Sequence, residues 1–188
     1  MLELKNIWVK YGKKAAVRKL SLSVNKGDFV TILGANGAGK TTMLNAISGI
    51  VKVKKNEGEI YFKGEKISGW KPGKIASLGI IQIPESRELS GGQQQMLAVA
   101  RGLMAKPEVL LLDEPSLGLS PLMRQQLAEA IKAIHRERVT LVLMEQNARL
   151  GLMLASYGYV LENGEMSLQG KTSDLLKNED VKKAYFGV

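Results

Sequence analysis

The residues from Gly34 to Thr41 have types and spacing that could perform chemistry, and they read Gly-Ala-Asn-Gly-Ala-Gly-Lys-Thr. The apolar run Phe29–Leu33 precedes them and a helical pattern over about 40–50 follows, which is the strand, loop and helix context of a phosphate-binding loop. Glycines let backbone N–H groups approach phosphate oxygens, and the helix N-terminus adds partial positive charge. We therefore expect Lys40 to reach the β- and γ-phosphates of a nucleotide and Thr41 to hold Mg²⁺. The expected nucleotide-binding residues of this stretch are Gly34, Ala35, Asn36, Gly37, Ala38, Gly39, Lys40, Thr41 and Thr42.

Two acidic residues, Asp113 and Glu114, follow the apolar run Val109–Leu112. The carboxyl end of such a strand is where an open α/β sheet builds its ligand crevice. We expect Asp113 to hold Mg²⁺ through water, because a hard cation prefers oxygen ligands. We expect Glu114 to orient and deprotonate an attacking water, a contribution of roughly 10²–10⁴ to the rate. Together with the phosphate loop, these acids indicate a nucleotide hydrolase or a kinase.

A second anion site is predicted at Leu89-Ser90-Gly91-Gly92-Gln93, where a helix is expected over 91–105. Ser90 is placed as its N-cap, and the glycines expose N–H groups at the positive helix end. Two anion sites for one γ-phosphate imply two chains. The nucleotide-binding residues expected from this motif are Ser90, Gly91, Gly92 and Gln93.

With these motifs the chain resembles the ATP-binding cassette (ABC) proteins over essentially its whole length. The resemblance implies a P-loop NTPase of the α/β class, with a parallel core, an N-terminal antiparallel β subdomain and a helical subdomain. It also implies ATP and Mg²⁺ as cofactors. ATP would lie between the phosphate loop of one subunit and the motif at Ser90 of a second ATPase subunit, identical or paralogous. Tyr11 stands where the family stacks an aromatic ring on adenine; packing within a hairpin is the alternative.

Several stretches, among them Ile83–Arg87, Glu145–Asn147 and Ala184–Gly187, resemble the ATPase subunits of branched-chain amino-acid importers. This resemblance implies two membrane permease subunits and an extracytoplasmic solute-binding protein as partners. It also implies a peripheral position on the cytoplasmic face of the cell membrane. ATP-driven closure of the ATPase pair would then energise uptake.

Two site positions depart from the general ABC pattern. Where most members have Gln after a strand and Pro, this chain has Glu85, and Gln82 falls earlier, within the strand pattern. We favour Glu85 as the catalytic and metal-coupling group and keep Gln82 as the alternative. At the switch position the family has His and this chain has Gln146, which can donate a hydrogen bond to a γ-phosphate but cannot take up a proton. His135, the only imidazole, is expected on the solvated surface, so no imidazole-dependent pH step is expected in turnover.

The interval from Pro84 to Ser90 is short, since six residues span at most about 22 Å. The resemblance implies several tens of residues of helical subdomain there. We therefore expect that a segment is deleted or unobserved near Glu88–Leu89, which a Cα–Cα distance well above about 3.8 Å would reveal. The chain is then one ABC ATPase domain over 1–188, with a catalytic core from 1–83 and 107–188 and a remnant of the helical subdomain at 84–106.

The apolar patterns predict the strands and helices that would position these residues. Buried strands are predicted over 29–33, 109–112 and 139–144, another strand over 80–83, and an antiparallel group over 2–9, 20–24 and 58–62. A helix from Pro121 to about Arg136 has Ser120 as its N-cap. Short elements include a helix near 148–155 and a hairpin at Asn163-Gly164. Strands and helices alternate, which indicates a parallel α/β core.

The composition of the chain narrows the classes of function that it could have. The 188 residues contain no Cys, which excludes disulfides, zinc–cysteine sites, iron–sulfur clusters and a thiol nucleophile. The longest apolar stretches fall short of the roughly 20 residues of a membrane span, and the start does not resemble a signal peptide. The net charge of +9 keeps a nucleic-acid ATPase as an alternative, but no nucleic-acid partner is expected, because neither a coiled-coil insertion nor a zinc site is present. A small-molecule kinase is the other alternative, but such an enzyme would not need the motif at Ser90.

Overall fold

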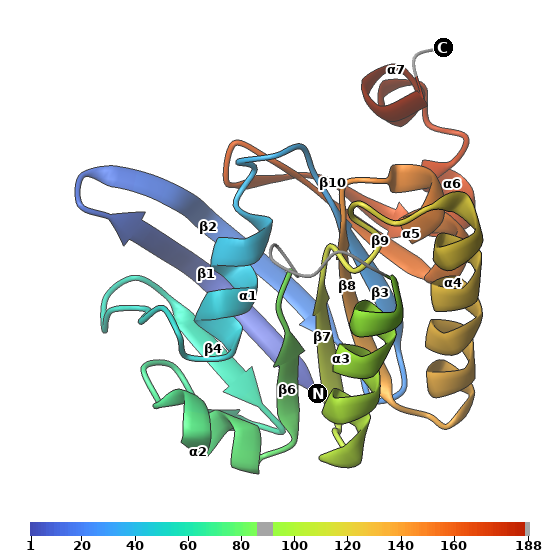
Figure 1. The fold of residues 1–188 in the computed structure, drawn as a ribbon. Helices are drawn as coiled ribbons and strands as arrows, with labels where there is room; N and C mark the ends of the chain where they lie inside the picture. The colour runs from blue at the N-terminus through green and yellow to red at the C-terminus, as the bar shows by residue number, and fades with distance from the viewer. Residues whose placement is uncertain (86–91, 187–188) are drawn as a thin grey trace.

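The computed structural model describes residues 1–85 and 92–186, whose strands form two sheets (Figure 1). The strands are β1 (Leu2–Tyr11), β2 (Lys14–Val24), β3 (Phe29–Leu33), β4 (Glu59–Phe62), β5 (Glu65–Lys66), β6 (Ile80–Ile83), β7 (Val109–Asp113), β8 (Thr140–Glu145), β9 (Tyr157–Glu162) and β10 (Glu165–Lys171). The helices are α1 (Lys40–Ile47), α2 (Pro72–Ser77), α3 (Gly92–Met104), α4 (Pro121–Arg136), α5 (Ala148–Leu154), α6 (Thr172–Leu175) and α7 (Glu179–Phe186).

The larger sheet has the order β10-β9-β3-β8-β7-β6, and every neighbouring pair from β9 to β6 is parallel. This confirms the predicted parallel α/β core. Because the strands are parallel, the loops that follow β3, β6, β7 and β8 all leave the same edge of the sheet. Those four loops carry the phosphate loop and the residues Glu85, Glu114 and Gln146.

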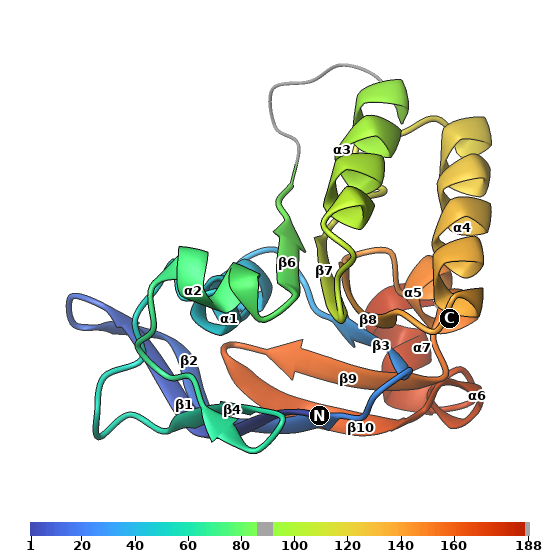
Figure 2. The same ribbon diagram turned by 90° about the horizontal axis from the view of Figure 1, so that it is seen from below.

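The two faces of the parallel sheet are covered by different layers, as Figures 1 and 2 show. Side chains alternate between the faces with the period of a strand, so Val30 and Ile32 join one core while Phe29 enters another. On the first face, α1 lies between this sheet and the antiparallel sheet β2-β1-β4-β5. On the second face, α3, α4 and α5 cover the sheet. The edge that carries these residues is therefore held by packing on both sides.

Local signals in the sequence account for several element ends. The Ser120 hydroxyl accepts a hydrogen bond from the Met123 N–H at 3.4 Å, and α4 begins at Pro121, as predicted. Between β9 and β10, Asn163 and Gly164 both have positive φ (50° and 84°), which is the backbone of a type I′ turn. The hairpin predicted at Asn163-Gly164 is confirmed.

Other element ends differ from prediction. Helix α1 ends at Ile47 instead of about residue 50, because Gly49 adopts φ 75° and stops the helix in the left-handed region. Strand β2 begins at Lys14, earlier than predicted, and the short helices α2, α6 and α7 were not predicted. In the described part of the chain, no helix has both the length and the apolar character to cross a bilayer.

Candidate functional site

The glycine-rich loop turns from β3 into α1 with its backbone close to neighbouring strands. Gly39 precedes the helix at φ 102°, which an L side chain rarely adopts. A Cβ atom at Gly39 would also lie 2.5 Å from the carbonyl oxygen of Ala16 on β2. By contrast, a Cβ atom at Gly37 would meet nothing within 4 Å, since Gly37 faces an open pocket. The loop therefore needs glycine both for its shape and for its approach to β2.

Lys40 is the first residue of α1, and its ammonium is buried under the loop. Its Nζ donates hydrogen bonds to the carbonyl oxygens of Gly34 at 2.6 Å and Ala35 at 3.0 Å. It also forms an ion pair with Glu114 Oε1 at 2.9 Å, and the two side chains are only 3% and 9% exposed. The predicted phosphate-binding cation and the predicted base are thus in direct contact in this structure.

Asp113 lies at the end of β7, opposite the start of α1. Its Oδ1 accepts a hydrogen bond from the Thr41 hydroxyl at 3.2 Å, and the residue is 1% exposed. Burial raises the pKa of Asp113 to about 6; the Thr41 hydrogen bond opposes this, and the charges of Glu114 and Glu85 add to it. Its other oxygen, Oδ2, is buried without a hydrogen-bond partner among the described residues. A buried carboxylate oxygen beside a hydroxyl fits the oxygen ligands that Mg²⁺ prefers.

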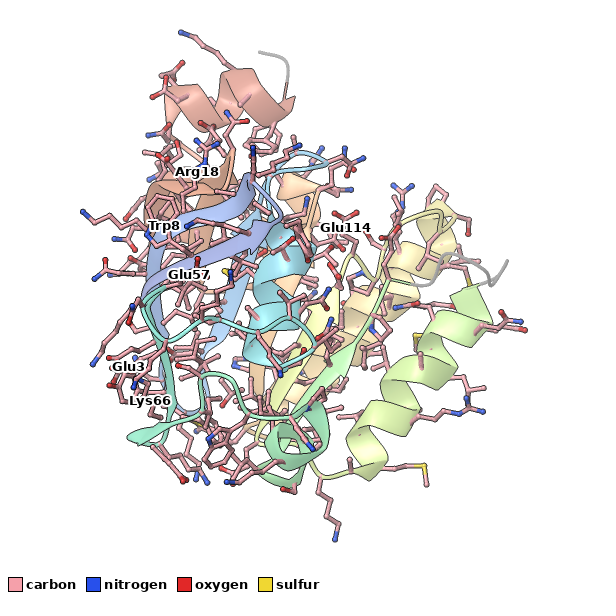
Figure 3. The ribbon with its side chains drawn as sticks, turned by 90° about the vertical axis from the view of Figure 1, so that its left-hand side faces the viewer. Glu3, Trp8, Arg18, Glu57, Lys66 and Glu114 are labelled. Atoms are coloured by element: carbon pink, nitrogen blue, oxygen red, sulfur yellow. The ribbon has the colours of Figure 1, made fainter. Side chains whose placement is uncertain are left out.

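A pocket of about 610 Å³ opens above these side chains, within the size range of small-molecule sites. Figure 3 labels Glu114 and Arg18, two of the residues that line it. The predicted residues that line the pocket are Tyr11, Asn36, Gly37, Gly39, Lys40, Thr41, Thr42, Glu85 and Glu114. Gly34 and Ala38 are buried beneath the loop, and Asp113 lies below Thr41. The structure therefore brings the phosphate loop and the acidic residues together.

Sequence reasoning missed two cations in the pocket, Lys14 and Arg18 of β2. They line it together with Ala15 and Ala16 of the same strand. The β9–β10 hairpin fixes this strand against the loop: the Arg18 N–H donates to the Gly164 carbonyl at 2.7 Å, and the Gly164 N–H donates to Ala38 at 3.0 Å. A strand prediction that began at Lys14 would have placed both cations beside the loop.

Glu85 and Gln82, the two alternatives for one role, occupy different surroundings. Glu85 is half-buried after β6 and lines the pocket. Gln82 lies within β6; its amide donates to Asn45 Oδ1 at 3.0 Å and its oxygen accepts from the Ser48 hydroxyl at 2.5 Å. Both partners of Gln82 belong to the α1 region, and Gln82 does not line the pocket. The placement favours Glu85.

Gln146 is exposed at the end of β8. Together with Glu114 it lines a second, smaller cavity of about 210 Å³. The residue before it, Glu145, is 2% exposed and was not singled out from the sequence. Burial, together with the nearby charge of Glu114, raises the pKa of Glu145 to about 7 against three hydrogen bonds from Ser116 and Asn147. Two carboxyl groups, Asp113 and Glu145, thus titrate near neutral pH.

The pKa of Glu145 gives a testable pH dependence of stability. In the folded protein this pKa is above the unfolded value, so the folded state binds more protons between about pH 4.5 and pH 7. We expect the free energy of unfolding of the wild type, relative to Glu145→Gln, to fall by about 3 kcal/mol as pH rises through this window. Urea unfolding at pH 4.5, 6 and 7.5 measures this difference. A difference that stays constant with pH would contradict the raised pKa.

His135 was predicted on the solvated surface, and this was wrong. Its ring packs against Phe29 with centroids 5.3 Å apart, and its Nε2 lies 3.0 Å from the Gly27 carbonyl oxygen. Gly27 precedes β3, whereas the phosphate loop follows it, so His135 is at the opposite end of the sheet from the site. It takes no part in the pocket described above.

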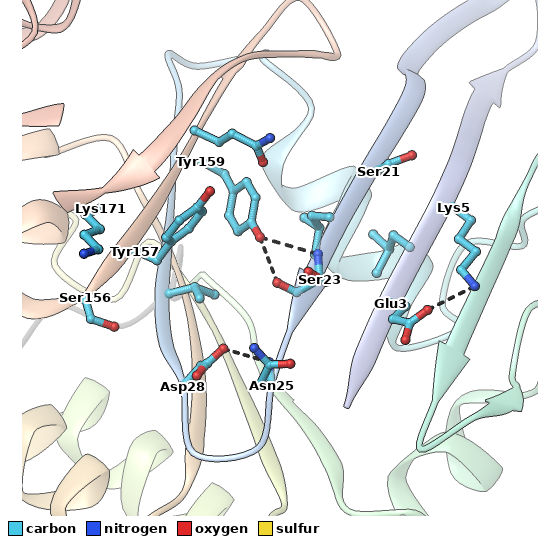
Figure 4. Close-up of a pocket in the computed structure, with 14 residues that line it drawn as sticks. Glu3, Lys5, Ser21, Ser23, Asn25, Asp28, Ser156, Tyr157, Tyr159 and Lys171 are labelled. Carbon is cyan, nitrogen blue, oxygen red and sulfur yellow. Dashed lines mark hydrogen bonds and ion pairs between the residues drawn. The ribbon is translucent and has the colours of Figure 1, made fainter. Parts of the chain in front are cut away.

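A larger hollow, about 850 Å³, lies between the antiparallel sheet and β9–β10 (Figure 4). Tyr159 lines it and donates from its hydroxyl to the Ser23 carbonyl at 2.8 Å, while its ring packs against Tyr157 at 5.1 Å. No residue of the phosphate loop lines this hollow. Size alone does not identify the site, because the smaller pocket holds the convergent glycines, cation and acids.

The predicted second anion site lies partly outside the described residues. Ser90 and Gly91, and the expected interruption at Glu88–Leu89, fall in 86–91. Gly92 is the first residue of α3, and Gln93 follows it on an exposed position. The helix predicted after the motif is therefore present from Gly92 onward.

Comparison with known proteins finds a matching family and relatives that cover the whole chain. The sequence model of the family described as ABC transporter matches residues 17–86 and 75–117, more than half of the chain. BraG, a high-affinity branched-chain amino acid transport ATP-binding protein of Pseudomonas aeruginosa, is 36% identical over 234 residues, covering 100% of both proteins. The probable branched-chain amino acid transport ATP-binding protein LivG of Archaeoglobus fulgidus is 25% identical, covering 100% of this chain and 95% of LivG.

A solved structure agrees with the fold. The ADP conformation of an ATP-binding cassette of an ABC transporter superposes with a TM-score of 0.88 at 24% identity, covering 100% of this chain and 99% of that one. The alignment with BraG is 46 positions longer than the 188 residues of this chain. The two family matches overlap at 75–86, close to the predicted interruption. The family match and the 36% identity over the full chain show that this protein belongs to the ABC transporter family, as an ATP-binding ATPase.

Proposed function

We propose that this chain is the ATP-hydrolysing subunit of an importer for branched-chain amino acids. The observation that carries the ATPase part is the direct contact of Lys40 with Glu114, beside the Thr41–Asp113 pair, at the edge of one pocket. The substrate class rests on the names of BraG and LivG. We also propose that the chain lies on the cytoplasmic face of the membrane, and this proposal rests on the family's role in transport.

ATP binding starts at the phosphate loop. Gly37 and Gly39 line the pocket, where their backbone N–H groups would bind the phosphates, and Lys40 exchanges its Glu114 contact for the β- and γ-phosphates. The exposed ring of Tyr11, at the rim of the same pocket, stacks on the adenine. Lys14 and Arg18 add positive charge on the β2 side of the pocket.

Thr41, Asp113 and Glu85 are the residues that would hold Mg²⁺. In a magnesium–nucleotide site, phosphates and water provide the remaining ligands. When bound, Mg²⁺ neutralises developing charge on the phosphate oxygens. The unpartnered Asp113 Oδ2 is the feature of this structure that fits such an ion.

Hydrolysis follows from the groups that face the γ-phosphate. Once Lys40 has moved to the phosphates, the Glu114 carboxylate is free to orient a water in line and accept its proton. Gln146, on the neighbouring loop, donates a hydrogen bond to the γ-phosphate from its amide. Because Gln146 carries no titratable group, proton transfer rests on Glu114.

The complete site needs a second ATPase subunit. In the pair, the motif at Ser90 of a second subunit covers the phosphate-loop pocket at the γ-phosphate. A twofold pair builds two such sites, and loss of the γ-phosphate releases them. Two membrane permeases and an extracytoplasmic solute-binding protein complete the importer.

We also propose that this chain lacks a segment of the helical subdomain near Glu88–Leu89. The 46 alignment positions without a residue of this chain support this, as does the family match, which falls into two ranges that overlap at 75–86. The domain boundaries follow, with 1–83 and 107–188 as the catalytic core and 84–106 as the remnant of the helical subdomain.

Product analysis tests the reaction. We expect purified protein incubated with Mg²⁺ and ATP to release inorganic phosphate and ADP in equal amounts, because water is the acceptor. Chelation of Mg²⁺ with EDTA should abolish the release, since Asp113 and Thr41 alone leave the phosphate charge uncompensated. ³¹P NMR follows both products. A phosphorylated metabolite formed in place of free phosphate would identify a kinase, and leucine uptake by proteoliposomes with co-purified permeases tests the transport role.

A further inference from the structure

Glu145, the last residue of β8, carries a buried carboxylate that the proposed mechanism does not use. Its Oε1 accepts a hydrogen bond from the Ser116 N–H at 3.3 Å. Its Oε2 accepts from the Ser116 hydroxyl at 3.0 Å and from the Asn147 N–H at 3.4 Å. One carboxylate therefore bonds two loops. Ser116 lies 29 positions before Glu145 along the chain, and Asn147 lies in the loop that directly follows Glu145.

The two loops carry the two groups proposed to act on the γ-phosphate and the water. Ser116 follows Glu114 by two residues, and Asn147 directly follows Gln146. Glu114, Gln146 and Glu145 all line the cavity of about 210 Å³ between the loops. A shift of either loop at Glu145 would therefore change the separation of Glu114 and Gln146.

The backbone of Glu114 needs such support. Its φ of 44° is in the left-handed region, which costs a non-glycine residue free energy and persists only when neighbouring groups hold it. One anchor is the Glu114 N–H, which donates to the Met144 carbonyl at 3.0 Å. The other is the contact of Ser116 with Glu145. Both anchors lead to the last two residues of β8.

We propose that Glu145 is a positioning residue for hydrolysis, whose carboxylate fixes the Glu114 loop and the Gln146 loop in one geometry. This inference rests on the proposed function, because it takes Glu114 as the base and Gln146 as the γ-phosphate donor. A misplacement of about 1 Å can cost a reaction roughly 100-fold, so a group that holds both loops affects kcat without touching the nucleotide.

The chemistry of the contact requires a carboxylate. All three partners donate, and an ionised carboxylate accepts on both oxygens. A glutamine at position 145 would place an NH₂ group against one of them. At the position of Oε2 the NH₂ can donate to a rotated Ser116 hydroxyl but opposes the Asn147 N–H, and at the position of Oε1 it opposes the Ser116 N–H. In either orientation one backbone contact is lost.

Turnover of a small set of variants tests the role. Glu145→Ala removes all three contacts, and we expect kcat to fall roughly 10- to 100-fold with the KM for ATP changed less than about threefold. Glu145→Gln loses one of the three contacts, and its kcat should fall between those of the wild type and Glu145→Ala. Ser116→Ala removes only the hydroxyl contact and should lower kcat the least. An unchanged kcat in Glu145→Ala, with wild-type ATPase activity present, would overturn the inference.

Thr172→Val is the matched control for the loss of a buried hydrogen bond. The Thr172 hydroxyl donates to the Ala155 carbonyl at 2.9 Å, and it is buried away from the pocket. We expect this variant to lower the melting temperature with kcat unchanged. If Thr172→Val lowered kcat as much as Glu145→Ala, the effect would be one of general stability and the inference would be wrong.

Hydrogen exchange separates this inference from the proposed function. In the nucleotide-free protein, we expect the Ser116 and Asn147 amides to exchange slowly in the wild type and to accelerate together in Glu145→Ala. Acceleration of one amide alone would overturn the shared contact. A wild type that releases no phosphate would instead overturn the proposed function, whatever the exchange shows.

The pH profile supplies a readout that a purely structural residue would not move. The charged residues that line the cavity with Glu145 are Glu114, from the loop after β7, and Arg124, from α4. Protonation of Glu145 turns one acceptor into a donor, so kcat should decrease as pH falls below about 7. We expect Glu145→Gln to lack that step. Persistence of the full step in Glu145→Gln would contradict the role.

Discussion

Glu114→Gln is expected to lower kcat for ATP hydrolysis by roughly 10²–10⁴-fold while ATP still binds. The amide cannot accept a proton from water, and this removes the general base. Its size matches the carboxylate, so the buried contact at Lys40 Nζ, 2.9 Å away in the wild type, keeps an acceptor. Phosphate release under saturating Mg²⁺ and ATP measures kcat. Small-angle scattering measures whether the ATP-bound variant accumulates as a closed pair.

Glu137→Gln is the matched control for the loss of a carboxylate. Glu137 is exposed after the last turn of α4, far along the sheet from the pocket, and we expect kcat to remain that of the wild type. ATP-dependent stabilisation should persist in Glu114→Gln, because Lys40 no longer has a charged internal partner. Wild-type turnover in Glu114→Gln would remove Glu114 as the base.

The core of the fold was predictable because its signals are local. Strands β3 and β7 are buried on both faces and are apolar at almost every position, which only a covered parallel sheet explains. The N-cap at Ser120 and the turn at Asn163-Gly164 each fix one boundary by side-chain or backbone chemistry. The short helices α6 and α7 lack such long patterns, and tertiary packing against β9 and β10 decides them.

The β2 side of the pocket could not be predicted from local sequence signals. Asn6 on β1 and Lys19 on β2 have φ of 49° and 45°, and the pairing of the two strands shifts register between Leu4 and Lys10. Bulges of this kind break the alternation from which a strand is recognised. The prediction therefore began the strand at Leu20 and missed Lys14 and Arg18 beside the phosphate loop.

The buried contact of Glu145 could not be predicted from the sequence. Glu145 follows the apolar run of β8, but its partner Ser116 is 29 residues away, and only the β7–β8 pairing brings them together. The pKa of Glu145, about 7, adds one expectation about turnover. A pH step near neutrality that survives His135→Ala is assigned to the Glu145 carboxyl group.

Lys40→Met is expected to destabilise the nucleotide-free protein by about 3 kcal/mol, because it leaves a buried carboxylate without its cation. Glu114 is 8% exposed, and the methionine removes the ion pair. The pocket admits water to the site, which places the cost at the lower end for a broken buried pair. Urea unfolding without nucleotide measures it, and Mg²⁺ with ATP should no longer raise the melting temperature.

The double variant Lys40→Met, Glu114→Gln separates the ion pair from the loss of lysine packing. Because it removes both charges, it should cost less than Lys40→Met alone, giving a coupling of about 1–3 kcal/mol in the cycle. Strict additivity of the two single variants would contradict the ion pair. A measured coupling means that ATP must separate Lys40 from Glu114 before the carboxylate can act on water. Phosphate binding and release of the base then become one event, since the cation that holds the base is the cation that the nucleotide needs.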